Sequence, residues 1–121
     1  MNKYRNTPQD IHKRIYNFII NCYKDVVKKI PKTVESIPII SQVSSSLTSI
    51  GANDQEADAT ITKKDFIAKY MIVKKEAKET RYWLSLIMDL DLSPKNIVEP
   101  YIQECQEILM IVSKIINNTR Y

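Results

Sequence analysis

Residues 62–87 read TKKDFIAKYMIVKKEAKETRYWLSLI, and this stretch decides the fold class. Its core-type positions recur at alternating steps of four and three residues, the spacing of one helix face and of a heptad seam. Thr62 precedes the repeat and Asp65 follows three residues later, a pairing that resembles a capping box at a helix start. We therefore predict a long amphipathic helix over residues 62–90. The repeat comprises Phe66, Tyr70, Val73, Ala77, Thr80, Leu84 and Ile87.

Helical periodicity appears three more times, on both sides of that stretch. Residues 9–30 carry an apolar stripe opposite a basic back, and Pro31 ends it because proline disfavours helix in the preceding residue. Residues 38–57 carry a narrow stripe among serines, so this helix depends on packing more than on propensity. Residues 97–118 carry a wide stripe, and Pro100 is expected to limit its upstream extent.

These four helices with short connections predict an all-α protein. The expected architecture is a single domain over residues 1–121, folded as an antiparallel up-down-up-down four-helix bundle with shallow crossing angles.

The composition excludes several classes of functional site. Gly51 is the only glycine of the 121 residues, whereas a Walker or dinucleotide phosphate loop needs several. His12 is the only histidine, and it is interpreted as an edge residue of the core and not as a ligand. Cys22 and Cys105 are far apart and read as small core residues. We therefore expect no metal site and no cofactor.

The charge is distributed unevenly along the chain. The net charge is +4, with 18 Lys and Arg against 14 Asp and Glu. Residues 1–32 and 61–96 are basic, whereas residues 33–60 contain four acids and no base. Two basic segments permit an anionic partner, above all nucleic acid. No apolar run approaches the roughly 18 residues of a membrane span, so we expect a cytoplasmic protein without a membrane partner.

Ten basic residues on the first and third predicted helices are the candidate nucleic-acid contacts. Such side chains would contact phosphates without reading bases. The alternative is a solvated face that Glu76 and Glu79 partly neutralise. This glutamate pair lacks a nucleophile or histidine beside it, so we expect no catalytic residues and no enzyme activity. The ten candidates are Lys13, Arg14, Lys24, Lys28, Lys29, Lys63, Lys64, Lys74, Lys78 and Arg81, of which Lys74, Lys78 and Arg81 are expected to share a face.

Two of the predicted helices are wider on their apolar side than a bundle core requires. Beside the core stripe of residues 9–30 lies a second one, made of Tyr16, Ile20, Tyr23 and Val27. Extra apolar width is typical of a partner surface, so these residues are the candidate oligomer interface. The alternative is that long aromatic side chains shield the edge of the core.

Three strings in the middle of the chain resemble a known bacterial family. They are SIGAN-x-x-EA at residues 49–57, KKDFI at residues 63–67 and KEA-x-ET-x-YWL at residues 75–84. In order and spacing they are similar to the four-helix-bundle family named for proteins encoded in intervening sequences of 23S ribosomal RNA genes. The resemblance implies a homopentamer with a central channel. It also implies kinship with the accessory variability determinant of diversity-generating retroelements, a basic pentamer that partners a reverse transcriptase and binds nucleic acid.

The residues within these strings favour structural roles. Gly51 is expected to let another helix approach closely. Asn53 and Glu56 are expected to satisfy backbone groups or to pair with a basic residue across the bundle. Tyr82 and Trp83 could stack on bases, although a Trp beside a heptad seam is more often packed. The family motif residues are Gly51, Asn53, Glu56, Glu76, Glu79, Tyr82 and Trp83.

The chain departs from the family in the second predicted helix. Serines occupy residues 44–46, where the family often carries arginines, and the acids Asp54, Glu56 and Asp58 would repel a nucleic-acid backbone. We therefore expect RNA or DNA to contact the first or third helix.

Taken together, these patterns predict a non-enzymatic oligomer that binds RNA or scaffolds a ribonucleoprotein through basic surfaces. A first alternative is an accessory subunit of a reverse transcriptase in a diversity-generating retroelement. A second is a purely structural oligomer without a nucleic-acid partner.

Overall fold

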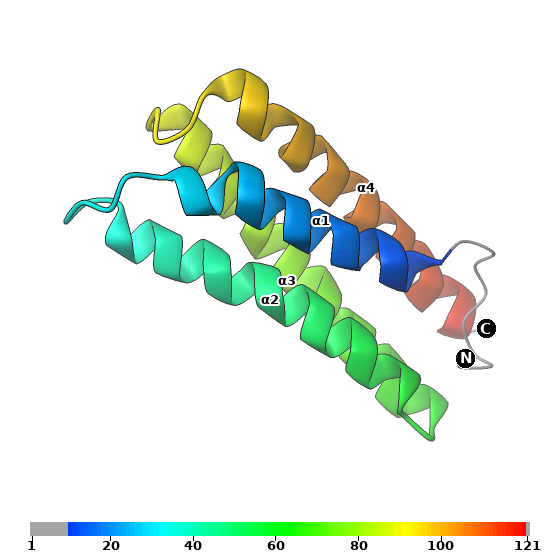
Figure 1. Ribbon diagram of the computed structural model, residues 1–121. Coiled ribbons are helices and arrows are strands. Elements are labelled where there is room, and N and C mark those ends of the chain that lie inside the picture. The colour runs from blue at the N-terminus through cyan, green and yellow to red at the C-terminus, as the bar shows by residue number, and fades with distance from the viewer. Residues whose placement is uncertain (1–9, 121) are drawn as a thin grey trace.

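Four α-helices and one short 3-10 helix form the part of the chain that the structure describes. The computed structural model describes residues 10–120. Successive helices run in opposite directions, and the start of α1 lies at the same end as the end of α4 (Figure 1). The predicted all-α four-helix bundle is confirmed over the described residues. In chain order the elements are α1 (Ile11–Asp25), η1 (Val27–Lys29), α2 (Ile37–Asp58), α3 (Lys63–Asp89) and α4 (Lys95–Arg120).

The helix α3 lies at the centre of the packing. It contacts both α2 and α4, whereas α1 sits between α2 and α4 and makes no close backbone contact with α3. All seven positions of the repeat that predicted this helix are buried. The Thr62 side chain accepts a hydrogen bond from the Asp65 backbone N–H at 3.1 Å, so the predicted cap forms. Within residues 10–120, no helix is both long and apolar enough to cross a lipid bilayer.

The first helix ends earlier than its predicted end at residue 30. Regular α-helix stops at Asp25, and Val27–Lys29 form one 3-10 turn. Ile30 is extended, with ψ 124°, as the residue before Pro31 should be. The tighter 3-10 winding turns the Val27 side chain inward, where it is only 4% exposed. Val27 therefore belongs to the core, and we remove it from the candidate oligomer interface.

The fourth helix begins further upstream than its predicted start at residue 97. It starts at Lys95, and the Pro94 carbonyl accepts hydrogen bonds from the amides of Ile97 and Val98 at 3.0 and 3.1 Å. Pro100 lies inside the helix and does not limit it. The missing N–H removes one helical hydrogen bond, but the buried stripe that continues on both sides of Pro100 holds the chain helical.

Small residues bring α2 and α3 close together. Ser46 of α2 is 2% exposed and Thr80 of α3 is fully buried, and their hydroxyl oxygens lie 2.8 Å apart. Each hydroxyl also reaches a backbone carbonyl of its own helix, at 3.3 Å for Ser46 and 2.9 Å for Thr80. The polar atoms of this contact are thus satisfied inside the core. The serine-rich helix is held by packing, as its sequence predicts.

Gly51 marks a close approach of α1 to α2. A Cβ at Gly51 would lie 2.7 Å from the Ile19 Cδ1 atom. We expect Gly51→Ala to change the free energy of unfolding by less than about 1 kcal/mol, because the gain in helix propensity offsets the displacement of a flexible methyl. In an Ile19→Val background, which lacks that methyl, Gly51→Ala should stabilise by up to about 1 kcal/mol. Urea unfolding of the four proteins measures both effects, and equal destabilisation in both backgrounds would contradict this account.

Candidate nucleic-acid interface

The outward face of α3 combines lysines with an aromatic ring. Its residues recur at steps of four and three, like the core residues, but on the opposite side of the helix, so they point to solvent. All six are exposed, and they include three cations and no acid. This surface, called the α3 stripe below, consists of Lys64, Ala68, Met71, Lys75, Lys78 and Tyr82.

The stripe continues into a hollow at the end of the bundle where α3 begins and α4 ends. The hollow has a volume of about 410 Å³, and Lys63, Lys64, Ile67 and Arg120 line it. Three of these four described residues are cations, so the hollow attracts anions. Sequence reasoning missed Arg120 because it is distant in the chain and meets the lysines only through the antiparallel packing of α3 and α4.

The predicted face of Lys74, Lys78 and Arg81 does not form as a single outward surface. Lys78 is exposed, but Lys74 is half-buried. The Arg81 guanidinium is half-buried and donates a hydrogen bond to the Gln106 side chain of α4. Lys75 takes the place expected for Arg81 on the exposed side. The signal for Lys75 was present in the sequence, since it lies half a turn from the buried Val73 and Ala77.

Arg14 holds α1 against α4. Its Nε and Nη2 atoms donate to the two Glu104 carboxylate oxygens, both at 2.8 Å, and Nη2 lies 3.7 Å from Glu107. The hydrogen bond to Glu104 raises the pKa of the guanidinium. A bidentate pair of this kind occupies the fork that would otherwise bind a phosphate. We therefore exclude Arg14 from the candidate interface.

The remaining cations of the first helix form a second, separate surface. Lys13 and Lys24 are exposed on α1, and Lys28 and Lys29 are exposed on η1. Because α1 lies diagonally across the bundle from α3, these residues cannot join the α3 stripe on one monomer (Figure 1).

His12 lies between two carboxylates at the start of α1. Its Nδ1 atom is 2.5 Å from the Asp54 Oδ2 atom, and its Nε2 atom is 2.6 Å from the Asp58 Oδ2 atom. The Tyr70 hydroxyl donates to the other Asp54 oxygen at 2.7 Å. Both ring nitrogens face carboxylate oxygens, and an N–H on either nitrogen can donate a hydrogen bond to its carboxylate. These four residues, the His12 cluster, join α1, α2 and α3.

The acids of α2 are therefore not a free negative surface. Asp54 is 1% exposed, and the Asp58 Oδ2 atom lies 2.6 Å from the His12 Nε2 atom. The Glu56 carboxylate pairs with the Lys69 ammonium of α3 at 2.9 Å. The Asn53 amide donates to the Ser49 carbonyl at 2.9 Å. The expected repulsion of nucleic acid by these acids is thus weakened, because Asp54 is buried and the Lys69 ammonium pairs with Glu56.

The aromatic motif residues differ in their exposure. Trp83 packs against the core, whereas Tyr82 is 59% exposed. Their ring centroids are 4.9 Å apart and the rings meet at 74°. Nearby, a hydrogen bond with Glu76 raises the pKa of the Glu79 carboxyl. The two glutamates therefore interact with each other. Between Asp65 and Asp89 they are the only acids of α3, and they lie at the side of the stripe.

Both cysteine thiols lie buried in the core. Burial raises the pKa of both Cys22 and Cys105 to about 12, so neither thiol is a nucleophile near neutral pH. In the part of the chain that the structure describes, no group of three His, Cys, Asp or Glu is placed to hold a metal ion.

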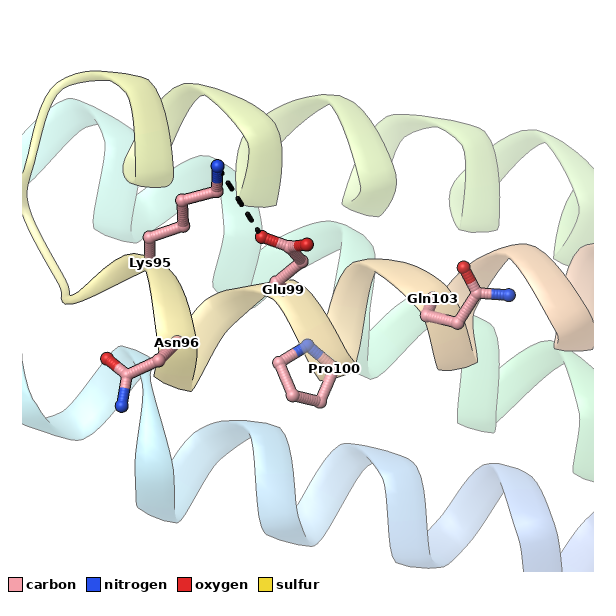
Figure 2. Close-up of a pocket in the computed structure, with 5 residues that line it drawn as sticks. All are labelled: Lys95, Asn96, Glu99, Pro100 and Gln103. Atoms are coloured by element: carbon pink, nitrogen blue, oxygen red, sulfur yellow. Dashed lines mark ion pairs between the residues drawn. The ribbon is translucent and has the colours of Figure 1, made fainter.

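A larger hollow on α4 has no convergent chemistry. Its volume is about 740 Å³, but a single helix supplies every described lining residue (Figure 2). Lys95 points toward Glu99, and their charged atoms lie 3.9 Å apart as an ion pair within one helix. Since no second element closes this surface and its cation is paired, we do not assign a site there.

The candidate oligomer residues are exposed to different degrees. Tyr16 is 65% and Ile20 37% exposed on α1, whereas Tyr23 is half-buried against the core. Tyr16 also lines a hollow of about 280 Å³ between α1 and α2, beside Gly51. Tyr16 and Ile20 therefore remain candidates for an apolar contact with a second copy.

The chain is similar to proteins of one family. Residues 8–114 match the family described as 23S rRNA-intervening sequence protein. A crystal structure of a protein from the S23 ribosomal protein family of Bacteroides thetaiotaomicron VPI-5482 is 33% identical to this chain. The similarity covers 88% of this chain and 97% of that one, with a TM-score of 0.75. That protein is described as having unknown function. No curated protein matches the chain.

Proposed function

Because the chain belongs to the 23S rRNA-intervening sequence protein family, we propose that it is a non-enzymatic nucleic-acid-binding protein whose preferred ligand is RNA. The observation that carries this proposal is the α3 stripe with its adjoining hollow. Lys64, Lys75, Lys78 and Arg120 are exposed there, and neither the stripe nor the described lining of the hollow contains an acid. The family name adds that these proteins are associated with ribosomal RNA genes.

The mechanism is electrostatic. The stripe from Lys64 to Tyr82 spans roughly 27 Å at about 1.5 Å per helical residue, long enough to follow several consecutive phosphates. Each ammonium that approaches a phosphate releases counterions, so affinity falls steeply as the salt concentration rises. Lysine contacts to phosphates position the strand without reading its sequence.

Assembly would multiply this weak monomer field. We propose that copies of the chain associate, as a homopentamer according to the family resemblance, with exposed Tyr16 and Ile20 contributing apolar contacts. Each copy added to a ring adds another α3 stripe, and simultaneous contacts raise the apparent affinity.

The test is a triple variant, Lys64→Gln, Lys75→Gln and Lys78→Gln. Fluorescence anisotropy titration with a labelled structured RNA should show binding at least about tenfold weaker at low salt. The slope of log affinity against log salt should fall by about two to three, since roughly one ion-release event is lost per phosphate contact. Light scattering of the same samples reports the oligomeric state.

The matched control changes the same number of charges on other faces. Lys32, Lys95 and Lys114 are exposed outside the stripe, and their replacement by Gln should leave affinity within about threefold of wild type. Equal weakening by both triple variants would show that net charge and not the stripe binds RNA. No binding of folded wild type at low salt would refute the proposal and leave a purely structural oligomer.

A further inference from the structure

The α3 stripe ends in an aromatic ring that electrostatics alone does not explain. Tyr82 is 59% exposed, although tyrosine gains stability by burying its ring. It follows Lys78 by four residues, about one turn, and Lys75 by seven, about two turns, on the same exposed helix face. A row of lysines ending in an exposed ring combines the two features used by proteins that bind unpaired nucleotides.

The Tyr82 ring also contacts the ring of its neighbour, Trp83. Trp83 packs against the core, and the Tyr82 and Trp83 rings meet at 74° with centroids 4.9 Å apart. In such an edge contact, either the Tyr82 edge meets the Trp83 face or the Trp83 edge meets one Tyr82 face. At least one face of the Tyr82 ring is therefore left uncovered by Trp83. An already oriented ring loses little side-chain entropy when a base stacks on it.

We propose that the α3 stripe binds unpaired nucleotides, with one base stacked on Tyr82 and the adjoining phosphates on Lys78 and Lys75. This inference rests on the proposed function and narrows its ligand to single-stranded or looped segments. In a duplex the bases are paired and stacked on one another, so an outward-facing ring on a convex helix cannot reach a base face. The lysines contact phosphates in either form, whereas the tyrosine distinguishes them.

The test compares Tyr82→Ala with Tyr82→Trp on two labelled ligands, an unstructured single-stranded RNA and a duplex RNA of equal charge. We expect Tyr82→Ala to weaken single-strand binding about tenfold and Tyr82→Trp to retain it, because each stacked base contributes substantially to affinity. Duplex binding should change by less than about twofold, since phosphate contacts are intact. A single-stranded DNA of the same sequence, run in parallel, shows whether the strand chemistry matters.

The matched control is Met110→Ala, which removes a large, 61% exposed apolar side chain from α4, outside the α3 stripe. It should leave single-strand binding unchanged. Trp83 is the only tryptophan, and it touches Tyr82, so its fluorescence should respond to single-stranded RNA and not to duplex.

The inference is overturned if Tyr82→Ala weakens both ligands equally, or neither, or if Met110→Ala has the same effect. In those cases lysine-dependent binding would still uphold the proposed function. Absence of binding to every nucleic acid would instead refute the proposed function, and this inference with it.

Discussion

Asp54→Ala is expected to lower the free energy of unfolding by about 3 kcal/mol, measured by urea denaturation at neutral pH. Asp54 is 1% exposed, and its two oxygens accept hydrogen bonds from the His12 ring and the Tyr70 hydroxyl. The substitution removes both acceptors at once and leaves the Tyr70 hydroxyl and the half-buried His12 Nδ1 atom without this carboxylate. The effect is large because breaking a buried pair costs more than the pair's net contribution.

Graded controls follow from the geometry of the His12 cluster. Tyr70→Phe removes one hydrogen bond to Asp54 and should cost about 1 kcal/mol. Asp58 is 31% exposed, so solvent screens its contact with His12, and Asp58→Ala should cost no more than about 1 kcal/mol. In the double variant Asp54→Ala with Tyr70→Phe, the two losses should not add, because they share one contact. An Asp54→Ala loss no larger than that of Tyr70→Phe would contradict this account of the cluster.

The His12 cluster also shows what one sequence cannot predict. Periodicity places His12 beside the core stripe of α1 and Asp54 on α2, but a side-chain contact between residues distant in the chain depends on how the helices pack. The same holds for Arg14. The sequence predicts a basic surface residue, but the packing of α1 against α4 places its guanidinium on Glu104. Periodic burial was predictable because each helix carries it alone. Pairing was not, because it needs two helices.

The residues of the candidate interface also differ in whether one helix alone predicts them. Lys64, Lys78 and Tyr82 were singled out from residue type and family resemblance, and all three are exposed. The predicted basic face of α3 contained Lys74, whereas the exposed residue is its neighbour Lys75. The buried heptad positions predict this, because Lys75 lies opposite them on the helix. Arg120 could not be found this way, since only the antiparallel return of α4 places it beside Lys63 and Lys64.

Local irregularities account for the errors at the helix ends. The sequence predicted that Pro31 ends the first helix, but not that the preceding turn tightens and buries Val27. Pro100 was interpreted as a boundary because an isolated helix avoids proline after its first turn. The buried positions of α4 lie on both sides of it, from Val98 to Thr119, and tertiary packing outweighs the local preference.

That conflict makes Pro100→Ala a stabilising substitution. Pro100 is exposed and is the sixth residue of α4. Amides of the first helical turn have no partner within the helix, but Pro100 lies beyond that turn. Alanine would restore an N–H that donates to the Asn96 carbonyl and would replace the poorest helix former by the best. We expect the free energy of unfolding to rise by about 2 kcal/mol. This rise is smaller than the roughly 3 kcal/mol difference in helix propensity, because the chain around Pro100 is already helical.

The matched control for Pro100→Ala is Pro38→Ala. Pro38 is also exposed, but it lies in the first turn of α2, where proline removes no helical hydrogen bond. Pro38→Ala should therefore change stability by less than about 0.5 kcal/mol in the same urea titration. RNA affinity should be unaffected by Pro100→Ala, because Pro100 lies outside the α3 stripe. If Pro100→Ala were neutral or destabilising, the helix would have to be bent at Pro100 to fit its neighbours. Straightening it would then disturb the contacts of Val98 and Tyr101 with the core.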